Sequence, residues 1–363
     1  MKIILTGGGT IGSVSPLIAI KQELEKQKIQ ADYLWVGTET GIEKNIIDKQ
    51  NIPYKAIKSA KLRRYFSGWN FLVPFQFLVG WFQSLKIIIK FKPDIILSAG
   101  SFVCVPVVLA GWLLKKKTVI HQQDFKVGLA NRIMAPFSSK VTATFEKSVK
   151  DFSSTKTQLT GNPVRQEIFS GSKEKAMQLF NLQPDLPTLL IMGGSLGATK
   201  LNKLIFEAVP ELVNICQIIH ITGKGQEIEW VDKEKFGEKA NRYHSIGYLY
   251  KDLVHAYAAA DLTVCRAGMS TLTELTALRK AMLLVPIPDN QQEENARFFD
   301  SKNAVILMDQ KTITADQMVT ILVGLLSNPN SLQRLQHNLG SVMLEGANEK
   351  YVEFITSLIK KKK

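Results

Sequence analysis

The chain has 363 residues, of which 45% are hydrophobic and 21% are charged, a composition that excludes a peptide-sized scaffold and a disordered basic tail. At roughly 150 residues per domain, this length predicts about two domains. The net charge of +14 lies almost entirely in residues 1–150, which hold 22 basic and 9 acidic side chains, so this part is expected to meet a negatively charged partner.

Short apolar runs rich in β-branched residues alternate with longer segments of helical period along the whole chain. The first group of predicted strands is Lys2–Leu5, Asp32–Val36, Ile95–Ser98 and Thr118–His121. The second group is Thr188–Met192, Gln217–Thr222, Leu262–Cys265 and Met282–Val285. Such alternation forms βαβ units with parallel strands, so the pattern predicts an α/β protein with two doubly wound domains.

The sequence Gly161-Asn162-Pro163 marks the predicted domain boundary, because this cluster ends periodic structure and a residue before proline disfavours helix. The predicted domains therefore cover residues 1–162 and 163–340. A helical segment follows at 341–363 and ends in a four-lysine tail, Lys360–Lys363.

Three cysteines, Cys104, Cys216 and Cys265, lie in separate apolar runs, too far apart for a CxxC pair or a metal knuckle. Buried free thiols in a reducing compartment are expected. The apolar stretch before the first glycines is too short for the h-region of a secretory signal, so a cytoplasmic location is expected as well.

A glycine-rich turn follows the first strand of each predicted domain, at Gly7–Thr10 and at Gly193–Ala198. In such turns the backbone N–H groups and the positive end of the next helix face an anion such as a diphosphate. Neither turn is a Walker loop or a GxGxxG fingerprint with an acidic ribose ligand. A tight turn chosen for packing is the alternative, but the equivalent placement in two domains favours a ligand held between them.

Seven motifs occur in the order found in glycosyltransferase family 28, and the chain resembles this family from its first strand to past Ala296. The motifs are Gly8-Gly9-Thr10 with Pro16, Gly100-Ser101-Phe102-Val103 with Pro106, His121-Gln122-Gln123-Asp124, Gly161-Asn162-Pro163-Val164-Arg165, Gly193-Gly194-Ser195-Leu196-Gly197-Ala198, Cys265-Arg266-Ala267-Gly268 with Thr271 and Glu274, and Gln291-Gln292 with Asn295-Ala296. Each motif alone is weak, whereas the ordered set is specific.

The resemblance implies a GT-B fold, in which two Rossmann-like domains face a cleft, the second holds most of the sugar nucleotide, and the final helix packs back on the first. The implied activity is inverting transfer of N-acetylglucosamine from UDP-GlcNAc to undecaprenyl-pyrophosphoryl-MurNAc-pentapeptide in peptidoglycan synthesis. Another family 28 lipid glycosyltransferase, or a catalytically weakened homologue that binds UDP-sugar or lipid, are the alternatives.

The resemblance also implies which residues bind substrates. Ser195 and Arg165 would contact the diphosphate, Tyr250 would lie where backbone groups hold the uracil, and Gln291 and Gln292 would bind the sugar hydroxyls. The full substrate-binding set is Thr10, Ile11, Gly12, Asp124, Arg165, Ser195, Tyr250, Arg266, Met269, Ser270, Thr271, Leu272, Thr273, Glu274, Gln291 and Gln292.

Residue chemistry supports part of this set. Glu274 can accept hydrogen bonds from two vicinal ribose hydroxyls, and Ser270 or Thr271 at a helix start can donate to phosphate. An exposed helix residue is the alternative for Glu274, a solvated helix start for Gln291 and Gln292, and a surface ion pair for Arg165. The sequence contains no Asp-x-Asp, so a divalent metal is not implied. No other cofactor is expected.

The catalytic base is the point at which the sequence departs from the family. Ser13 stands where the family's first loop ordinarily has histidine, and a serine hydroxyl is no base near neutral pH without help. Asp124 and His121 are the other candidates for proton abstraction, so the catalytic candidates are Asp124, His121 and Ser13. The alternative is that His121 makes only local hydrogen bonds and that Asp124 caps the following helix.

The segment from Lys61 to Phe82 combines cations with aromatic residues, among them Arg63, Arg64, Trp69, Phe75, Phe77, Trp81 and Phe82. Asn70, Pro74 and Gln76 interrupt it, so it falls short of the roughly 20 apolar residues of a spanning helix. The pattern favours a segment that lies on an anionic inner membrane surface, with the aromatic residues as helix core and the cations as a solvated face as the alternative. Nucleic acid is disfavoured as the partner, because no recognised binding module is present.

Overall fold

The computed structural model describes residues 1–59, 73–194, 197–227 and 236–360 of the chain. The chain forms two compact units, one made of Met1–Arg165 with Leu344–Lys363 and one made of Gln166–Met343. The sequence-based boundaries were placed at 162 and 340, and the structure divides the chain after Arg165 and after Met343. The end of the lysine tail, 361–363, lies outside the described residues.

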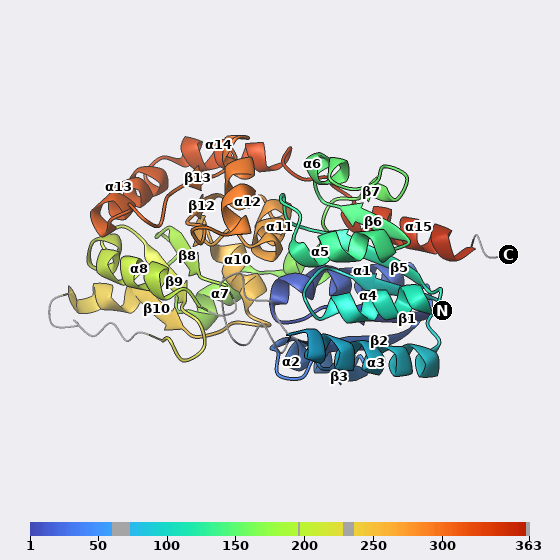
Figure 1. Cartoon of the computed structure of the whole chain (residues 1–363). Coiled ribbons are helices and arrows are strands. Elements are labelled where there is room, and N and C mark those ends of the chain that lie inside the picture. The colour runs from blue at the N-terminus through green and yellow to red at the C-terminus, as the bar shows by residue number, and fades with distance from the viewer. Residues whose placement is uncertain (60–72, 195–196, 228–235, 361–363) are drawn as a thin grey trace. The chain divides into compact units, whose positions relative to one another are not determined.

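Within the described residues, the sheet of unit 1 has seven strands in the order β3-β2-β1-β4-β5-β6-β7, and neighbouring strands are parallel (Figure 1). The strands are β1 Lys2–Thr6, β2 Asp32–Thr38, β3 Tyr54–Ile57, β4 Ile95–Ser98, β5 Lys117–Gln122, β6 Lys140–Ala143 and β7 Thr157–Leu159. All four strands predicted for this unit are confirmed. The others, β3, β6 and β7, are short and lie toward the sheet edges.

The helices of unit 1 cover both faces of this sheet. They are α1 Ser15–Lys26, α2 Glu43–Asp48, α3 Val73–Phe91, α4 Cys104–Leu113, α5 Leu129–Met134, α6 Glu146–Lys150 and α15 Ala347–Lys360, with 3-10 turns η1 Ile11–Ser13 and η3 Ala135–Phe137. Alternate strand residues point to opposite faces. One face, with Ile4, Ile96 and Ile120, forms a core with α3 and α4.

Helix α15 returns to unit 1 at the end of the chain and packs against α1. Asn348 fixes its start, because its Oδ1 accepts from the Val164 N–H at 2.7 Å and its Nδ2 donates to the Val164 carbonyl at 2.7 Å. The buried ring of Tyr351 lies edge-on to His121 with 5.7 Å between the ring centroids. The last helix is therefore part of the unit 1 core.

Unit 2 has a parallel sheet in the order β10-β9-β8-β11-β12-β13 within its described residues (Figure 1). Its strands are β8 Thr188–Met192, β9 Gln217–Ile221, β10 Tyr243–Ile246, β11 Leu262–Cys265, β12 Met282–Leu284 and β13 Ile306–Leu307. Its helices are η4 Gln166–Ser170, α7 Lys173–Leu179, α8 Thr199–Leu212, η5 Gly237–Arg242, α10 Leu253–Ala259, α11 Met269–Ala277, α12 Gln291–Asp300, α13 Ala315–Leu326 and α14 Pro329–Leu339. The prediction of two doubly wound α/β domains is confirmed.

Each sheet reverses its strand order beside its first strand, between β1 and β4 in unit 1 and between β8 and β11 in unit 2. In open parallel sheets, ligands bind outside the carboxyl ends of the strands at this switch point. The turns that follow these four strands are therefore the first places to look for a site.

Two further expectations concern burial and hydropathy. The three cysteines are free and buried as predicted, and burial raises the pKa of each thiol to about 12. Among the helices that can be described, none combines the length and the hydropathy needed to cross a bilayer.

Candidate functional site

The first glycine turn of unit 1 is held by the side chain of Ser13. This buried hydroxyl accepts from the Gly8 N–H at 2.9 Å and lies 3.1 Å from the Gly8 carbonyl and 3.2 Å from the Thr10 carbonyl. A Cβ on Gly7 would lie 2.2 Å from the Ser13 carbonyl oxygen, so the turn has no room for a larger residue there. Ser13 thus shapes the turn through contacts with its backbone.

A buried carboxylate holds the same turn from its other side. Glu43 Oε2 accepts from the Gly9 N–H at 3.0 Å, and Oε1 accepts from the Thr38 N–H at 2.7 Å and from the Thr38 hydroxyl. Tyr54 donates to the Thr38 carbonyl at 2.6 Å, with Glu43 Oε1 3.2 Å away. The amides of Gly8 and Gly9, expected to face an anion, therefore donate to Ser13 and Glu43.

Ser101 links the two turns at the switch point of unit 1. Its Oγ donates to the Gly8 carbonyl at 2.7 Å, which joins the turn after β1 to the turn after β4. Its φ of 111° lies in the region that favours glycine. The hydrogen bond offsets part of this backbone strain.

The two candidate bases that follow β5 occupy different environments. His121 is fully buried, with Nδ1 2.9 Å from the Thr142 hydroxyl and Nε2 2.8 Å from Asn162 Oδ1. Burial lowers the pKa of His121 to about 4. Asp124 lies three residues further on, beyond the carboxyl end of the strand, and is partly exposed. Of the two side chains, Asp124 is therefore the one with surface open to solvent.

The second glycine turn, after β8, packs against the turn after β9. A Cβ on Gly197 would lie 2.8 Å from the Thr222 carbonyl oxygen, and one on Gly223 would lie 2.6 Å from the Cα of Gly197. Asn202 of α8 supports this contact, because its Nδ2 donates to the Thr222 carbonyl at 2.8 Å and its Oδ1 lies 3.2 Å from His220 Nε2. Ser195, the predicted diphosphate contact, lies outside the described residues.

Helix α11 begins beside the switch point of unit 2. Gly268 precedes it and has no side chain with which to cap the first turn of amides. The side chains of Met269, Leu272 and Thr273 are buried, whereas Ser270 and Thr271 are partly exposed. The predicted binding segment Met269–Glu274 therefore presents Ser270, Thr271 and backbone N–H groups, and these groups suit an anion.

Glu274 and Arg266 make well-defined contacts inside unit 2. Glu274 is 4% exposed and accepts at Oε2 from the Tyr257 hydroxyl at 3.0 Å, so it is not the solvated helix residue of the alternative. Arg266 donates from Nη1 to the Val285 carbonyl at 2.7 Å and from Nη2 to Gln310 Oε1. Burial lowers the pKa of Arg266. The guanidinium therefore joins the turn after β11 to the loop after β12.

The start of α12 lies next to that of α11. Asn290 caps α12 by accepting from the Gln292 N–H, and Gln292 Oε1 accepts from the Ile287 N–H at 3.3 Å. The buried Asn295 donates to the Ala267 carbonyl at 3.1 Å, which ties the two helix starts together. Gln291 and Gln292 are partly exposed there.

The remaining predicted substrate residues are spread over both units. Tyr250 is partly exposed in the loop between β10 and α10 of unit 2. Arg165 is the last residue of the first segment of unit 1. Thr10, Ile11 and Gly12 also belong to unit 1, where they lie in the turn after β1. The structure thus brings Arg266, the α11 start and the α12 start together within unit 2.

Helix α3 carries the described part of the aromatic segment. Phe75 and Phe82 are 67% and 56% exposed, whereas Phe77 is partly buried and Trp81 packs against the unit 1 core. Lys86 and Lys90 on the same helix are exposed. The core interpretation therefore holds for Trp81, whereas the membrane interpretation of the exposed Phe75 and Phe82 stays a prediction. Arg63, Arg64 and Trp69 lie outside the described residues.

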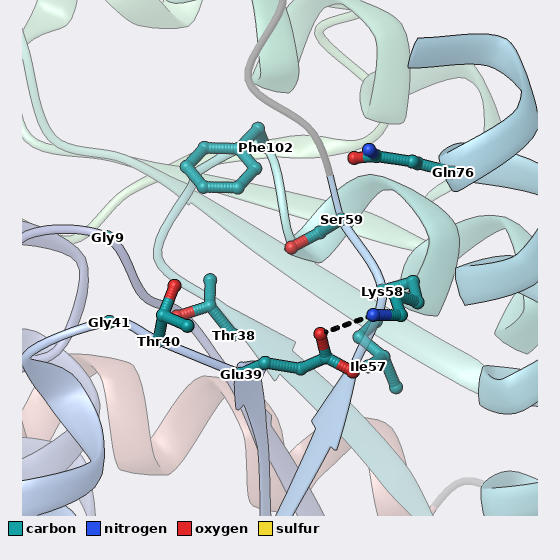
Figure 2. Close-up of a pocket in the computed structure, with 10 residues that line it drawn as sticks. All are labelled: Gly9, Thr38, Glu39, Thr40, Gly41, Ile57, Lys58, Ser59, Gln76 and Phe102. Atoms are coloured by element: carbon teal, nitrogen blue, oxygen red, sulfur yellow. Dashed lines mark hydrogen bonds and ion pairs between the residues drawn. The ribbon is translucent and has the colours of Figure 1, made fainter. Parts of the chain in front are cut away.

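A polar cavity of about 280 Å³ in unit 1 was not anticipated from the sequence (Figure 2). It lies where β1, β2 and β3 end, and Lys58 and Glu39 form a 2.8 Å ion pair beside it. Its lining consists of Gly9, Thr38, Glu39, Thr40, Gly41, Ile57, Lys58, Ser59, Gln76 and Phe102. These residues come from separate segments, and Gly9 and Phe102 are the ones that belong to motifs named in the sequence analysis.

Both units match models of known protein families. Residues 3–143 match the glycosyltransferase family 28 N-terminal domain and residues 188–350 match the glycosyltransferase family 28 C-terminal domain. A Legionella pneumophila protein named UDP-N-acetylglucosamine--N-acetylmuramyl-(pentapeptide) pyrophosphoryl-undecaprenol N-acetylglucosamine transferase is 35% identical over 98% of this chain and 96% of its own. A Bacillus cereus transferase of the same name, numbered 2, is 37% identical over 88% and 89%.

Solved structures share the fold. The crystal structure of Acinetobacter baumannii MurG is similar with a TM-score of 0.72 at 24% identity, over 98% of this chain and 99% of that one. A UDP-GlcNAc 2-epimerase from Neisseria meningitidis bound to UDP-GlcNAc gives 0.70 at 14% identity, over 98% and 100%. At these identities the likeness concerns the arrangement of helices and strands.

Proposed function

Since the chain belongs to glycosyltransferase family 28, we propose that it transfers N-acetylglucosamine from UDP-GlcNAc to the lipid-linked acceptor undecaprenyl-pyrophosphoryl-MurNAc-pentapeptide, in peptidoglycan synthesis. The observation that carries this proposal is the match of nearly the whole chain, at 35% identity, to a relative that bears the name of this activity.

The donor binds at the carboxyl ends of β8, β11 and β12 in unit 2. The first turn of α11 offers amides, Ser270 and Thr271 to the diphosphate, as a helix start does for an anion. Glu274 accepts from the ribose hydroxyls with its carboxylate oriented by Tyr257, and Gln291 and Gln292 bind the sugar hydroxyls. The family resemblance adds Tyr250 to this set and implies diphosphate contacts for Arg165 and Ser195.

The reaction inverts the anomeric carbon in one displacement and uses no metal. The acceptor hydroxyl attacks as the bond to UDP breaks, and the departing diphosphate takes up the negative charge. The absence of Asp-x-Asp from the sequence supports this route, and so does the uncapped start of α11, whose amides can stabilise that charge.

Asp124 is the general base that removes the proton from the attacking hydroxyl. Its partial exposure beyond the carboxyl end of β5 supports this role. His121 has a structural role, since both ring nitrogens lie within hydrogen-bond distance of protein groups. Its pKa of about 4 also makes it a weak base. Ser13 likewise serves the shape of the turn.

The protein acts at the cytoplasmic face of the cell membrane, on which it lies without spanning it. The exposed Phe75, Phe82 and Ile89 of α3 support this location, because apolar side chains beside lysines suit the boundary of an anionic bilayer. Each lysine near such a surface contributes about 1 kcal/mol of attraction.

A binding role without efficient transfer is the second candidate, and the engagement of Ser13 with the turn backbone is the observation that favours it. Transfer of labelled GlcNAc to a lipid-linked acceptor distinguishes the two. We expect transfer, and we expect Asp124→Asn to lower kcat about 100-fold or more with little change in UDP affinity. Asp151→Asn, at an exposed carboxylate of unit 1, is the matched control. UDP-GlcNAc binding without transfer by the unmodified protein would favour the second candidate.

The membrane assignment has its own test. Replacement of Phe75 and Phe82 by serine should abolish sedimentation with anionic vesicles, whereas Phe169→Ser, at a residue of unit 2 that is 55% exposed, should leave it unchanged. Sedimentation of the double variant at the original level contradicts the assignment.

A further inference from the structure

The chain segment that leads to Arg165 is held one residue before it by a side chain from the last helix. Asn348, at the start of α15, is 5% exposed. Its Oδ1 accepts from the Val164 N–H and its Nδ2 donates to the Val164 carbonyl, both at 2.7 Å. Paired residues of an antiparallel sheet exchange two bonds in the same way. One side chain therefore serves both backbone groups of Val164.

The second of these bonds acts on the peptide group that carries Arg165. The Val164 carbonyl and the Arg165 N–H belong to one planar unit, which also includes the Arg165 Cα. A hydrogen bond to that carbonyl therefore restrains the point from which the Arg165 side chain extends. Arg165 itself is partly exposed, and its guanidinium is a group that suits a diphosphate.

The residues before Val164 are restrained as well. Gly161 has a φ of 78°, and a Cβ on it would lie 3.0 Å from the Cβ of Ala347. Asn162 Oδ1 lies 2.8 Å from Nε2 of the buried His121. The segment thus reaches Val164 through close contacts, and the two bonds from α15 restrain its last step.

Helix α15 gives Asn348 a firm base. Tyr351 and Ile355 are fully buried on the same helix. Near the end of the helix, Lys117 donates from Nζ to the Leu358 carbonyl. Because the helix is anchored along its length, the Asn348 side chain has a fixed origin, and its bonds to Val164 cost little ordering.

We propose that Asn348 is a positioning residue for the donor, because it holds Arg165 where the guanidinium meets the diphosphate of UDP-GlcNAc. The inference rests on the proposed function, which gives Arg165 that contact. A cation held in place contributes more to affinity than one that must be ordered when the ligand binds. Asn348 acts through Arg165, since both polar ends of its amide bond to Val164.

The UDP affinity of the full chain, measured by isothermal titration calorimetry, provides the first test. Asn348→Leu keeps a side chain of similar size, removes both bonds and should raise the UDP Kd about 5-fold. Arg165→Ala should raise it about 30-fold, since it removes a charged hydrogen-bond donor. In the Arg165→Ala background, Asn348→Leu should change the Kd less than about 2-fold, because no guanidinium remains to be positioned. An undiminished loss in that background overturns the proposal.

A second ligand and a matched variant separate positioning from a merely structural role. Uridine lacks the diphosphate, so Asn348→Leu should leave its Kd within about 2-fold. Ile355→Ala opens a cavity on the same helix, about 10 Å further along, and should lower the free energy of unfolding while leaving both Kd values unchanged. If Ile355→Ala weakens UDP as much as Asn348→Leu does, or if uridine is weakened as much as UDP, Asn348 only anchors the helix.

The unmodified protein offers a test that needs no variant. Coupling between two sites is reciprocal, so UDP should slow hydrogen–deuterium exchange at the start of α15, in peptide 344–352, at least about 3-fold. Uridine should leave this exchange unchanged. Equal exchange with and without UDP contradicts the proposal.

These measurements are separable from the proposed function, because UDP binding needs no acceptor. An unmodified protein that transfers GlcNAc, but in which the effects of Asn348→Leu and Arg165→Ala on UDP affinity are additive, overturns the inference alone. An unmodified protein that shows the coupling but no transfer overturns the proposed function and leaves Asn348 as a positioning residue for UDP.

Discussion

The two units share a sheet topology, yet their first glycine turns are completed in different ways. In unit 1 the amides of Gly8 and Gly9 donate to Ser13 and Glu43, and Ser101 bonds to the Gly8 carbonyl. In unit 2 the turn packs against Gly223, and the helix at the switch point begins after a glycine that cannot cap it. In unit 1 the amides of the turn after β1 thus have acceptors within the protein, whereas in unit 2 the start of α11 has no side-chain cap and keeps amides that suit a ligand.

The largest expected effect concerns the carboxylate that fills the first turn. Glu43→Ala would leave the buried N–H groups of Gly9 and Thr38 without an acceptor, so we expect a loss of about 4 kcal/mol in the free energy of unfolding of unit 1. Hydrogen–deuterium exchange read separately in peptides 1–26 and 188–226 measures it. The second set should stay protected; equal loss in both units would show that the turns are not independent.

Acidification should affect both units alike. Burial lowers the pKa of His121 in unit 1 and of His220 in unit 2 to about 4, against about 6.5 when unfolded. Between these pH values the unfolded state binds more protons, so stability rises with pH and is lost as pH falls from 6.5 to 4, by about 3 kcal/mol per histidine at pH 4. Urea unfolding between pH 4 and 7 measures this slope. His121→Gln should remove it from unit 1 alone, and an unchanged slope contradicts the assignment.

A smaller effect isolates the close packing of the second turn. Gly197 and Gly225 both have φ of 74°, but a Cβ on Gly197 meets the Thr222 carbonyl whereas one on Gly225 meets nothing within 4 Å. Alanine at either position carries the same backbone strain of about 1 kcal/mol, and Gly197→Ala should cost about 1 to 2 kcal/mol more. Urea unfolding of the two variants measures the difference in their free energies of unfolding. Equal losses would mean that the turn after β9 moves to make room for the Cβ.

The smallest expected effect separates strain from hydrogen bonding at Ser101. Ser101→Ala keeps the positive φ and removes the bond to Gly8, so it should cost about 1 kcal/mol. Ser101→Gly also removes the bond but relieves the strain, and it should lie within about 0.5 kcal/mol of the unmodified protein. Thermal unfolding midpoints rank the three proteins. A glycine variant less stable than the alanine variant would show that the serine backbone is unstrained.

The fold followed from the sequence where strands are buried on both faces. Runs such as Leu189–Met192 are apolar without interruption, and the structure has them in central strands of parallel sheets. Strand β3 escaped prediction because Lys55 and Ala56 are exposed at the sheet edge, and β13 because it has two residues. The hydrophobic pattern therefore predicted the central strands of each sheet but not its edge strands.

The sequence predicted which residues belong to the candidate site, but it did not predict which groups they form hydrogen bonds with. The ordered motifs predicted Glu274, Gln291 and Gln292 as residues that bind substrate, on two helices of the second domain. The contacts of Arg266 with Val285 and of Glu43 with Gly9 join segments far apart in the chain, and no local pattern records them. The cavity beside Lys58 was missed for the same reason.

The return of α15 to unit 1 has a consequence for biosynthesis. Unit 2, residues 166–343, is inserted within unit 1, so the ribosome completes it before Tyr351 can cover His121. At about 5–20 residues per second, the face of the first sheet that α15 closes stays open for on the order of ten to thirty seconds. During that interval the nascent chain carries an unsealed apolar surface, which is an opportunity for a chaperone and a period of risk for aggregation.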